Sequence, residues 1–148
     1  MTAIVTTSLP PDWPLENGSI IVVRPHEHPY ILHFAVLIFD LGKWRIIHNN
    51  EENNVHLEDL ESLLKRADYV TIQMTQLTGK SPSFLLERFK IFQGMQYDVV
   101  EYNCETFVNQ FTYQKPVSSQ AIVYTLLAAF WIFVILYFLW KQKLKSLL

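Results

Sequence analysis

Residues 31–48 read "ILHFAVLIFDLGKWRIIH", and this stretch decides the fold. Its first half, residues 31–39, is apolar on both faces, which is typical of a central strand covered on each side. The tetrapeptide "DLGK" that follows predicts a tight turn, and residues 44–48 predict a returning strand. The stretch therefore predicts an antiparallel hairpin in the middle of a sheet.

Two histidines occur in this hairpin. His33 interrupts the most apolar strand of the chain, where an ionisable ring is costly unless it has a partner. With a two-residue turn at 41–42, His48 lies opposite Ala35. Because side chains alternate along a strand, His33 shares the face of Ala35, so His48 becomes its diagonal neighbour. We expect the two rings to lie within hydrogen-bond reach, although a shift of one residue in register would separate them.

The rest of the soluble part predicts a small α+β domain, with an antiparallel sheet packed against helices, over residues 18–114. The expected elements are further strands over 20–24 and 69–74, and helices over 57–67 and 82–93. Ser81 is the expected N-cap of the second helix. Residues 1–17 are expected to form an irregular arm, because three prolines oppose regular structure there.

The single cysteine lies in "EYNCETFVNQF", residues 101–111, where a third helix is expected to begin. Asn103 is a good N-cap, so Cys104 falls in the first turn, where the partial positive charge of the helix favours a thiolate. Apolar residues follow it at spacings of three, four and seven and form one stripe with the sulfur. A buried, unreactive cysteine would give the same stripe, so packing and chemistry both remain open for this thiol.

Residues 121–140 read "AIVYTLLAAFWIFVILYFLW" and contain no charge. Twenty such residues match a bilayer core of roughly 30 Å, which predicts a transmembrane helix. A linker over 115–120 precedes it and a basic tail over 141–148 follows. The positive-inside rule alone would place the tail in the cytoplasm, but the N-terminus has no secretory signal. We therefore expect a single-pass, C-terminally anchored protein whose domain is cytosolic.

Composition narrows the classes of function. The formal charge of −2 gives no reason to expect nucleic-acid binding, and one cysteine cannot form an internal disulfide. His26 and His28 lie two apart between prolines, which indicates a solvated loop rather than a metal site. His56 is expected to be exposed near the start of a surface helix. We expect no cofactor and no metal.

The ordered set "LHFAVLI", "IIH" and "NCETF", the last preceded by "QYDVVEY", carries a family resemblance. It resembles the NCEHF-type thiol acyltransferases and phospholipases, the family of lecithin:retinol acyltransferase and the H-Ras-like suppressors. The resemblance covers about residues 18–113 and implies a permuted NlpC-type, papain-like fold, in which the histidine strands precede the cysteine helix. The apolar segment after the domain also looks like that family.

Residue by residue, the resemblance implies that Cys104 is the nucleophile, His33 the general base and His48 the third polar residue. The motif's usual histidine is replaced by Thr106. The implied activity is that of a phospholipid acyltransferase or phospholipase A, which forms a thioester acyl-enzyme from a membrane phospholipid. A cysteine peptidase or amidase of the NlpC type remains an alternative, as does a catalytically silent, membrane-tethered interaction module.

Overall fold

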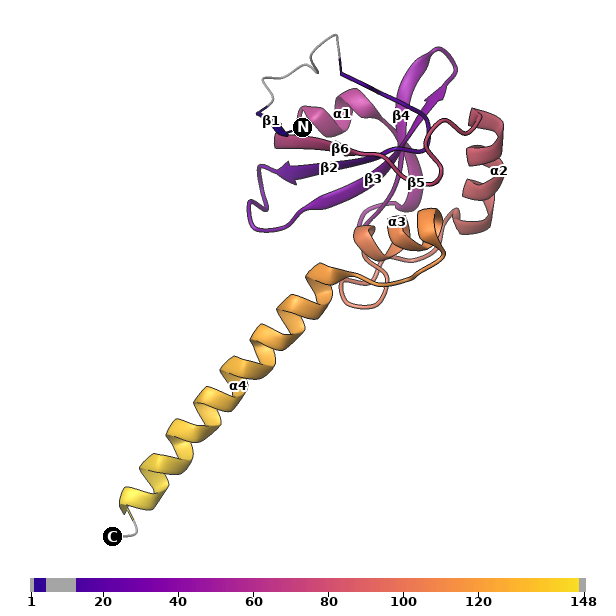
Figure 1. Cartoon of the computed structure of the whole chain (residues 1–148). Coiled ribbons are helices and arrows are strands. Elements are labelled where there is room, and N and C mark those ends of the chain that lie inside the picture. Colours follow the sequence, from indigo (N-terminus) through magenta and orange to yellow (C-terminus); the bar gives the residue numbers. More distant parts are fainter. Residues whose placement is uncertain (1, 5–12, 147–148) are drawn as a thin grey trace. The chain divides into compact units, whose positions relative to one another are not determined.

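The computed structural model describes residues 2–4 and 13–146, which form two compact units, Met1–Ser118 and Ser119–Leu148 (Figure 1). The first unit is an α+β domain, as predicted. Its antiparallel sheet has the strand order β1-β6-β2-β3-β4-β5. The strands are β1 (Thr2–Ile4), β2 (Ile20–Pro25), β3 (His33–Asp40), β4 (Lys43–Asn50), β5 (Asn54–Asp59) and β6 (Ala67–Gln73). The helices of this unit are α1 (Leu60–Leu64), α2 (Pro82–Phe92) and α3 (Cys104–Tyr113).

The central hairpin of β3 and β4 has the predicted register. Phe39 pairs with Trp44, and the ladder continues as far as Val36. Leu41 and Gly42 both have positive φ, 50° and 79°, as the two central residues of a type I′ turn require. The backbone twist of this turn matches that of the strands, so a two-residue loop fixes which side chains share a face.

Both faces of the sheet are covered, which explains why residues 34–39 of β3 are all apolar. Helices α2 and α3 cover one face, where the core includes Val22, Val36, Ile38, Ile47, Leu85, Phe107 and Phe111. The short helix α1 covers the other face, where the core includes Val23, Ala35, Leu37, Ile46, Leu60, Leu63 and Leu64. Alternate residues of one strand therefore enter two separate cores.

Helices α2 and α3 begin at the residues that the sequence predicts. The Oγ of Ser81 accepts a hydrogen bond from the N–H of Phe84 at 3.3 Å and caps α2. The Oδ1 of Asn103 accepts one from the N–H of Thr106 at 2.9 Å and caps α3. Each cap satisfies a main-chain donor that has no partner within its helix, so Cys104 is held as the first helical residue.

Two expectations about secondary structure are wrong. The helix expected over 57–67 is confined to Leu60–Leu64, because the preceding residues pair with β4 as strand β5. Cross-strand pairing therefore overrides a leucine spacing that also fits a helix. Part of the expected irregular arm, Thr2–Ile4, forms β1 and pairs with the edge of β6. The prolines at positions 10 and 11 lie outside the described residues.

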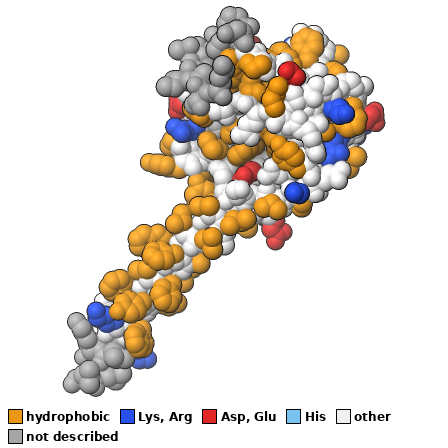
Figure 2. Space-filling view, viewed as in Figure 1, with side chains coloured by type: hydrophobic (Ala, Val, Ile, Leu, Met, Phe, Trp, Pro, Cys, Tyr) orange, Lys and Arg blue, Asp and Glu red, His pale blue; other side chains and the backbone are white. Residues whose placement is uncertain are grey.

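The second unit is the helix α4 (Ser119–Ser146). Within Ser119–Lys143, the most apolar window of 18 residues has a mean hydropathy of 2.5, and none of this window is buried. Figure 2 shows hydrophobic side chains along the visible face of this helix. The hydroxyl of Thr125 donates to the carbonyl of Ala121, so this polar group is satisfied within the helix. By length and composition α4 can cross a membrane.

Candidate functional site

The two histidines of the hairpin meet as predicted. The Nε2 of His33 lies 2.7 Å from the Nδ1 of His48, and the rings are nearly perpendicular, with an interplanar angle of 88°. His48 is 1% exposed, whereas His33 is partly buried at the start of β3. A buried imidazole requires a hydrogen-bond partner, and each ring supplies one to the other.

The hydrogen-bonded network continues beyond this pair. The other ring nitrogen of His48, Nε2, lies 3.0 Å from the Oε2 of Glu58 and 3.1 Å from the Nε2 of His56. Glu58 also accepts from Arg66, whose Nη2 lies 2.5 Å from Oε1. Strands β3, β4 and β5 thus bring three histidines and Glu58 to the α1 face of the sheet, and Arg66, which follows α1, pairs with Glu58.

Burial sets the charge state of this cluster. Desolvation, followed by the charge of His48, lowers the pKa of His33 to about 3. Desolvation also lowers the pKa of His48, although the hydrogen bond to Glu58 opposes it. That hydrogen bond is the main cause that lowers the pKa of Glu58, with a further contribution from Arg66. At neutral pH the two histidines are therefore neutral and Glu58 is ionised.

Cys104 begins α3, as expected, but its environment differs from the expectation. The thiol is 5% exposed, and Sγ lies 3.9 Å from the carbonyl oxygen of Leu32. Desolvation raises the pKa of Cys104 to about 11, although the main-chain N–H groups of Phe34 and Glu105 lower it in part. The expectation of a thiolate at the helix N-terminus is therefore wrong, because burial outweighs the local dipoles.

The helix that carries the thiol packs on the face of the sheet opposite the histidines. His33 shares the α1 face with Ala35, whereas α3 packs on the opposite face. Among the described residues no hydrogen bond joins Cys104 to a histidine. Instead, the sulfur lies against the main chain of Leu32 and Phe34, the two residues that flank His33. The structure thus brings the three predicted site residues to one position along β3, but it does not bring the sulfur into contact with a ring.

The motif residues after Cys104 serve the packing of the domain. Glu105 is buried, and its Oε2 accepts a hydrogen bond from Ser118 at 2.7 Å, which ties the end of the linker to the start of α3. Thr106 is 2% exposed. Thr106 therefore lies in the interior of the domain. Tyr97 lies near the thiol, and burial followed by the charge of Cys104 raises the pKa of its phenol to about 12.

His56 and Glu58 are the members of the cluster that sequence reasoning missed. Glu58 falls within the helix expected over 57–67 and His56 just before it, but the two residues occur at alternate positions of β5, so both face His48 across the ladder. In a strand, a histidine and a glutamate two residues apart share one face, so this spacing would indicate the cluster if residues 54–59 were read as a strand. His26 is exposed and pairs with Asp68 at 3.2 Å.

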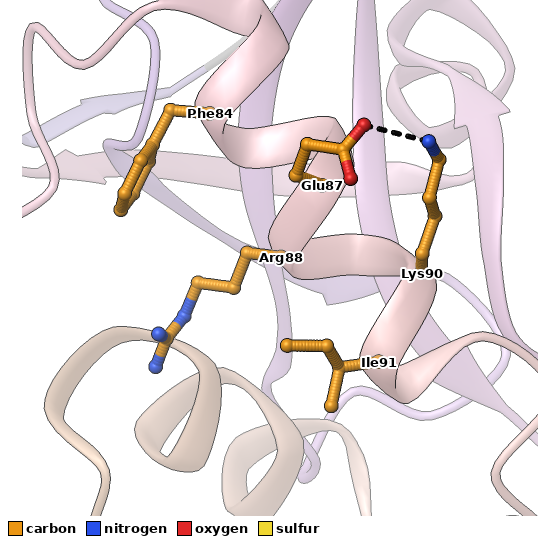
Figure 3. A pocket seen from close by; sticks show the side chains of 5 residues that line it. All are labelled: Phe84, Glu87, Arg88, Lys90 and Ile91. Atoms are coloured by element: carbon orange, nitrogen blue, oxygen red, sulfur yellow. Dashed lines mark hydrogen bonds and ion pairs between the residues drawn. The ribbon is translucent and has the colours of Figure 1, made fainter.

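A surface hollow lies elsewhere, on α2. Figure 3 shows its lining: Phe84, Glu87, Arg88, Lys90 and Ile91. The Nζ of Lys90 lies 2.6 Å from the Oε1 of Glu87, and Arg88 donates to the carbonyl oxygen of Phe111, which links α2 to α3. Its charged groups are paired with each other or with main chain, so the hollow presents no group poised for chemistry.

Comparison with known proteins leaves the family open. No protein-family model matches the chain, and no curated protein matches it. The resemblance carried by the cysteine motif therefore stays a prediction. A functional proposal depends on the arrangement of Cys104, His33 and His48.

Proposed function

We propose that the protein is a membrane-anchored, cysteine-dependent phospholipid acyltransferase or phospholipase A. One observation carries the proposal. The sulfur of Cys104 lies against the main chain on either side of His33, and the ring of His33 is held by His48 at 2.7 Å. A nucleophile, a base and an orienting group, the three parts of a thiol acyl-transfer site, are therefore neighbours at the start of β3, although the sulfur does not contact a ring.

The hydrogen bonds assign a role to each ring nitrogen. Because the Nε2 of His48 faces an ionised Glu58, that nitrogen carries the hydrogen and Nδ1 accepts. His33 then donates from Nε2 to His48, which leaves the lone pair of its Nδ1 as the base. His48 in this arrangement is an orienting group that fixes the tautomer of His33.

The reaction follows from these assignments. The Nδ1 of His33 takes the thiol proton while Cys104 attacks the ester carbonyl of a phospholipid, so a C–S bond forms. The ester C–O bond then breaks, and the lysophospholipid leaves with the proton from the imidazolium. Main-chain N–H groups at the start of α3 stabilise the oxyanion. Water, an amine or a lysophospholipid then attacks the thioester and releases the acyl group.

The resting arrangement requires a movement before the reaction. The thiol is protonated and contacts the carbonyl oxygen of Leu32 at 3.9 Å and the main-chain N–H groups of Phe34 and Glu105, so it must leave these contacts to reach His33. Catalytic hydrogen bonds are often long in free enzymes and shorten when substrate binds. The proposal therefore includes a lipid-dependent step that brings the sulfur to the imidazole.

In this proposal, α4 anchors the domain to the membrane that contains the phospholipid substrate. The charge-free, mainly apolar run of residues 121–140, exposed along the helix, is more stable in a bilayer than in water. As a single C-terminal anchor it keeps the domain beside phospholipids and raises their effective concentration. The domain faces the cytosol in this proposal, in keeping with its one free cysteine.

Intact-mass spectrometry tests the proposal. The full-length protein in detergent is incubated with phosphatidylcholine vesicles, together with Cys104→Ser, His33→Ala and the control His28→Ala, which removes an exposed histidine. We expect a hydroxylamine-sensitive acyl mass on the wild type and the control, and none on the other two variants.

Two other outcomes would contradict the proposal. No adduct with lipid, but an acyl mass from peptide or amide substrates, would indicate a cysteine peptidase or amidase. No adduct with either substrate would indicate a membrane-tethered interaction module.

A further inference from the structure

Three potential ligand atoms converge on the α1 face of the sheet. The Nε2 of His48 lies 3.1 Å from the Nε2 of His56 and 3.0 Å from the Oε2 of Glu58, and the three residues offer ligand atoms that all lie within 4.8 Å of one another. Atoms bound to one metal ion by bonds of about 2.0 to 2.2 Å lie roughly 3 to 3.5 Å apart. The two separations therefore fit ligands that share an ion, as well as hydrogen-bonded partners.

The outer contacts of these residues orient the ligand atoms. The Nδ1 of His56 lies 2.9 Å from the carbonyl oxygen of Asn54, which can only accept, so Nδ1 carries the hydrogen. In the neutral ring with this tautomer, the Nε2 lone pair of His56 points at His48. Arg66 holds the other oxygen of Glu58. Partners of this kind, a carbonyl for a histidine and a donor for a carboxylate, support the ligands of metal sites.

Counting hydrogens shows that the cluster has too many acceptors. His56 presents a lone pair, and ionised Glu58 presents two more on Oε2. Among the three converging atoms the single hydrogen is the one on the Nε2 of His48, and it can satisfy one of its two neighbours well. A cation between the three atoms satisfies all of them together.

We propose that His48, His56 and Glu58 bind one divalent transition-metal ion, with zinc as the ion that best suits this set. Two imidazoles and a carboxylate are common zinc ligands, and three protein ligands leave a fourth position open. The same set also suits ferrous iron, whereas magnesium and calcium prefer oxygen ligands. His48 is buried, while His56 and Glu58 are partly exposed on the edge strand β5, which gives the ion a route to the site.

Binding requires one rearrangement of hydrogens. The ion replaces the hydrogen on the Nε2 of His48, which moves to Nδ1, so His48 then donates to the Nε2 of His33. The hydrogen of His33 moves from Nε2 to Nδ1, and no proton is gained or lost by the pair. His33 is thus the outer partner of the ligand His48, and this assignment holds whether or not Cys104 has any activity.

Metal titration of the full-length, metal-free protein in detergent tests this site. Zinc is titrated against a chromophoric chelator, ferrous iron is tested separately without oxygen, and cobalt reports the ligands by its absorption spectrum. We expect one zinc per chain and a loss of affinity of more than about 100-fold in His56→Ala and in Glu58→Gln, since even outer partners contribute about 10- to 100-fold. Tighter binding of iron than of zinc would keep the site but overturn the assignment of zinc.

Matched controls separate this site from other sources of binding. His28→Ala removes an exposed histidine and Cys104→Ser removes the thiol, so both are expected to bind zinc as the wild type does. Circular dichroism confirms that each variant is folded, and Glu58→Gln keeps the shape of the side chain if His56→Ala does not fold. Absence of stoichiometric zinc, or equal affinity in all folded variants, would overturn the proposal and leave a hydrogen-bonded network. Because the readout is metal affinity, it is independent of acyl-enzyme formation.

Discussion

The titratable groups on the two faces of the sheet have different kinds of partner. On the α1 face, His33 and His48 belong to a network in which each side chain has a side-chain partner. On the α3 face, the described contacts of Cys104 are with main-chain groups. The cysteine helix thus packs on the face opposite the histidines, and one of the two groups must move for the proposed reaction to occur.

The largest expected effect concerns the reactivity of the thiol. Because burial raises the pKa of Cys104 to about 11, alkylation of the lipid-free protein should accelerate about tenfold per pH unit, or roughly 1,000-fold from pH 7 to pH 10. The rate of iodoacetamide labelling at Cys104, followed by mass spectrometry, checks this. The unfolded chain, whose thiol has an ordinary pKa, is the control and should level off above about pH 9. A plateau near neutral pH in the folded protein would show that the thiol is already activated.

The second largest expected effect concerns the free energy of unfolding, to which the two faces should contribute unequally. His48→Ala leaves His33 and Glu58 without their buried partner and should lower the free energy of unfolding by about 2 to 4 kcal/mol. Cys104→Ala removes one small group with a weak contact and should cost about 1 kcal/mol. Urea denaturation of both variants measures the difference. Equal losses would show that the network contributes no more than the thiol does.

A smaller effect should link the two faces if both proposals hold. Zinc at His48 moves the hydrogen of His33 onto Nδ1 and removes the lone pair that accepts the thiol proton. We expect saturating zinc to slow formation of the acyl-enzyme by about tenfold or more, within the range attributed to general base catalysis. His56→Ala should be insensitive to zinc, and inhibition that persists in this variant would indicate that zinc binds the thiol directly.

The smallest expected effect concerns the start of α3. Asn103→Ala removes the hydrogen bond to the N–H of Thr106 and should cost about 1 kcal/mol, as loss of a helix N-cap does. Asn103→Asp keeps the acceptor and is the matched control. Thermal unfolding measures both variants, and equal stability of Asn103→Ala and wild type would show that the cap does not hold Cys104 in place.

Local rules predict the part of the site that lies in the hairpin. A two-residue turn fixes the register of β3 and β4, and the register fixes the His33–His48 contact. The N-cap Asn103 likewise fixes the start of the cysteine helix. These features depend on residues close together in the sequence, so they can be read without tertiary structure.

The rest of the site depends on tertiary contacts. The leucines at 57, 60, 63 and 64 fit a helix, but pairing with β4 makes residues 54–59 a strand and brings His56 and Glu58 to His48. The environment of Cys104 is set by how deeply α3 packs on the sheet. Its raised pKa therefore cannot be read from the helix position alone.

The most direct test of the central claim is to locate the acyl group after reaction with phosphatidylcholine vesicles. Digestion and tandem mass spectrometry of the full-length protein identify the modified residue. We predict a thioester on Cys104 in the wild type and in His28→Ala, and none in His33→Ala. A wild-type protein that stays unmodified, or one in which His33→Ala is acylated as fast as the wild type, would contradict the claim that Cys104 and His33 act together across β3.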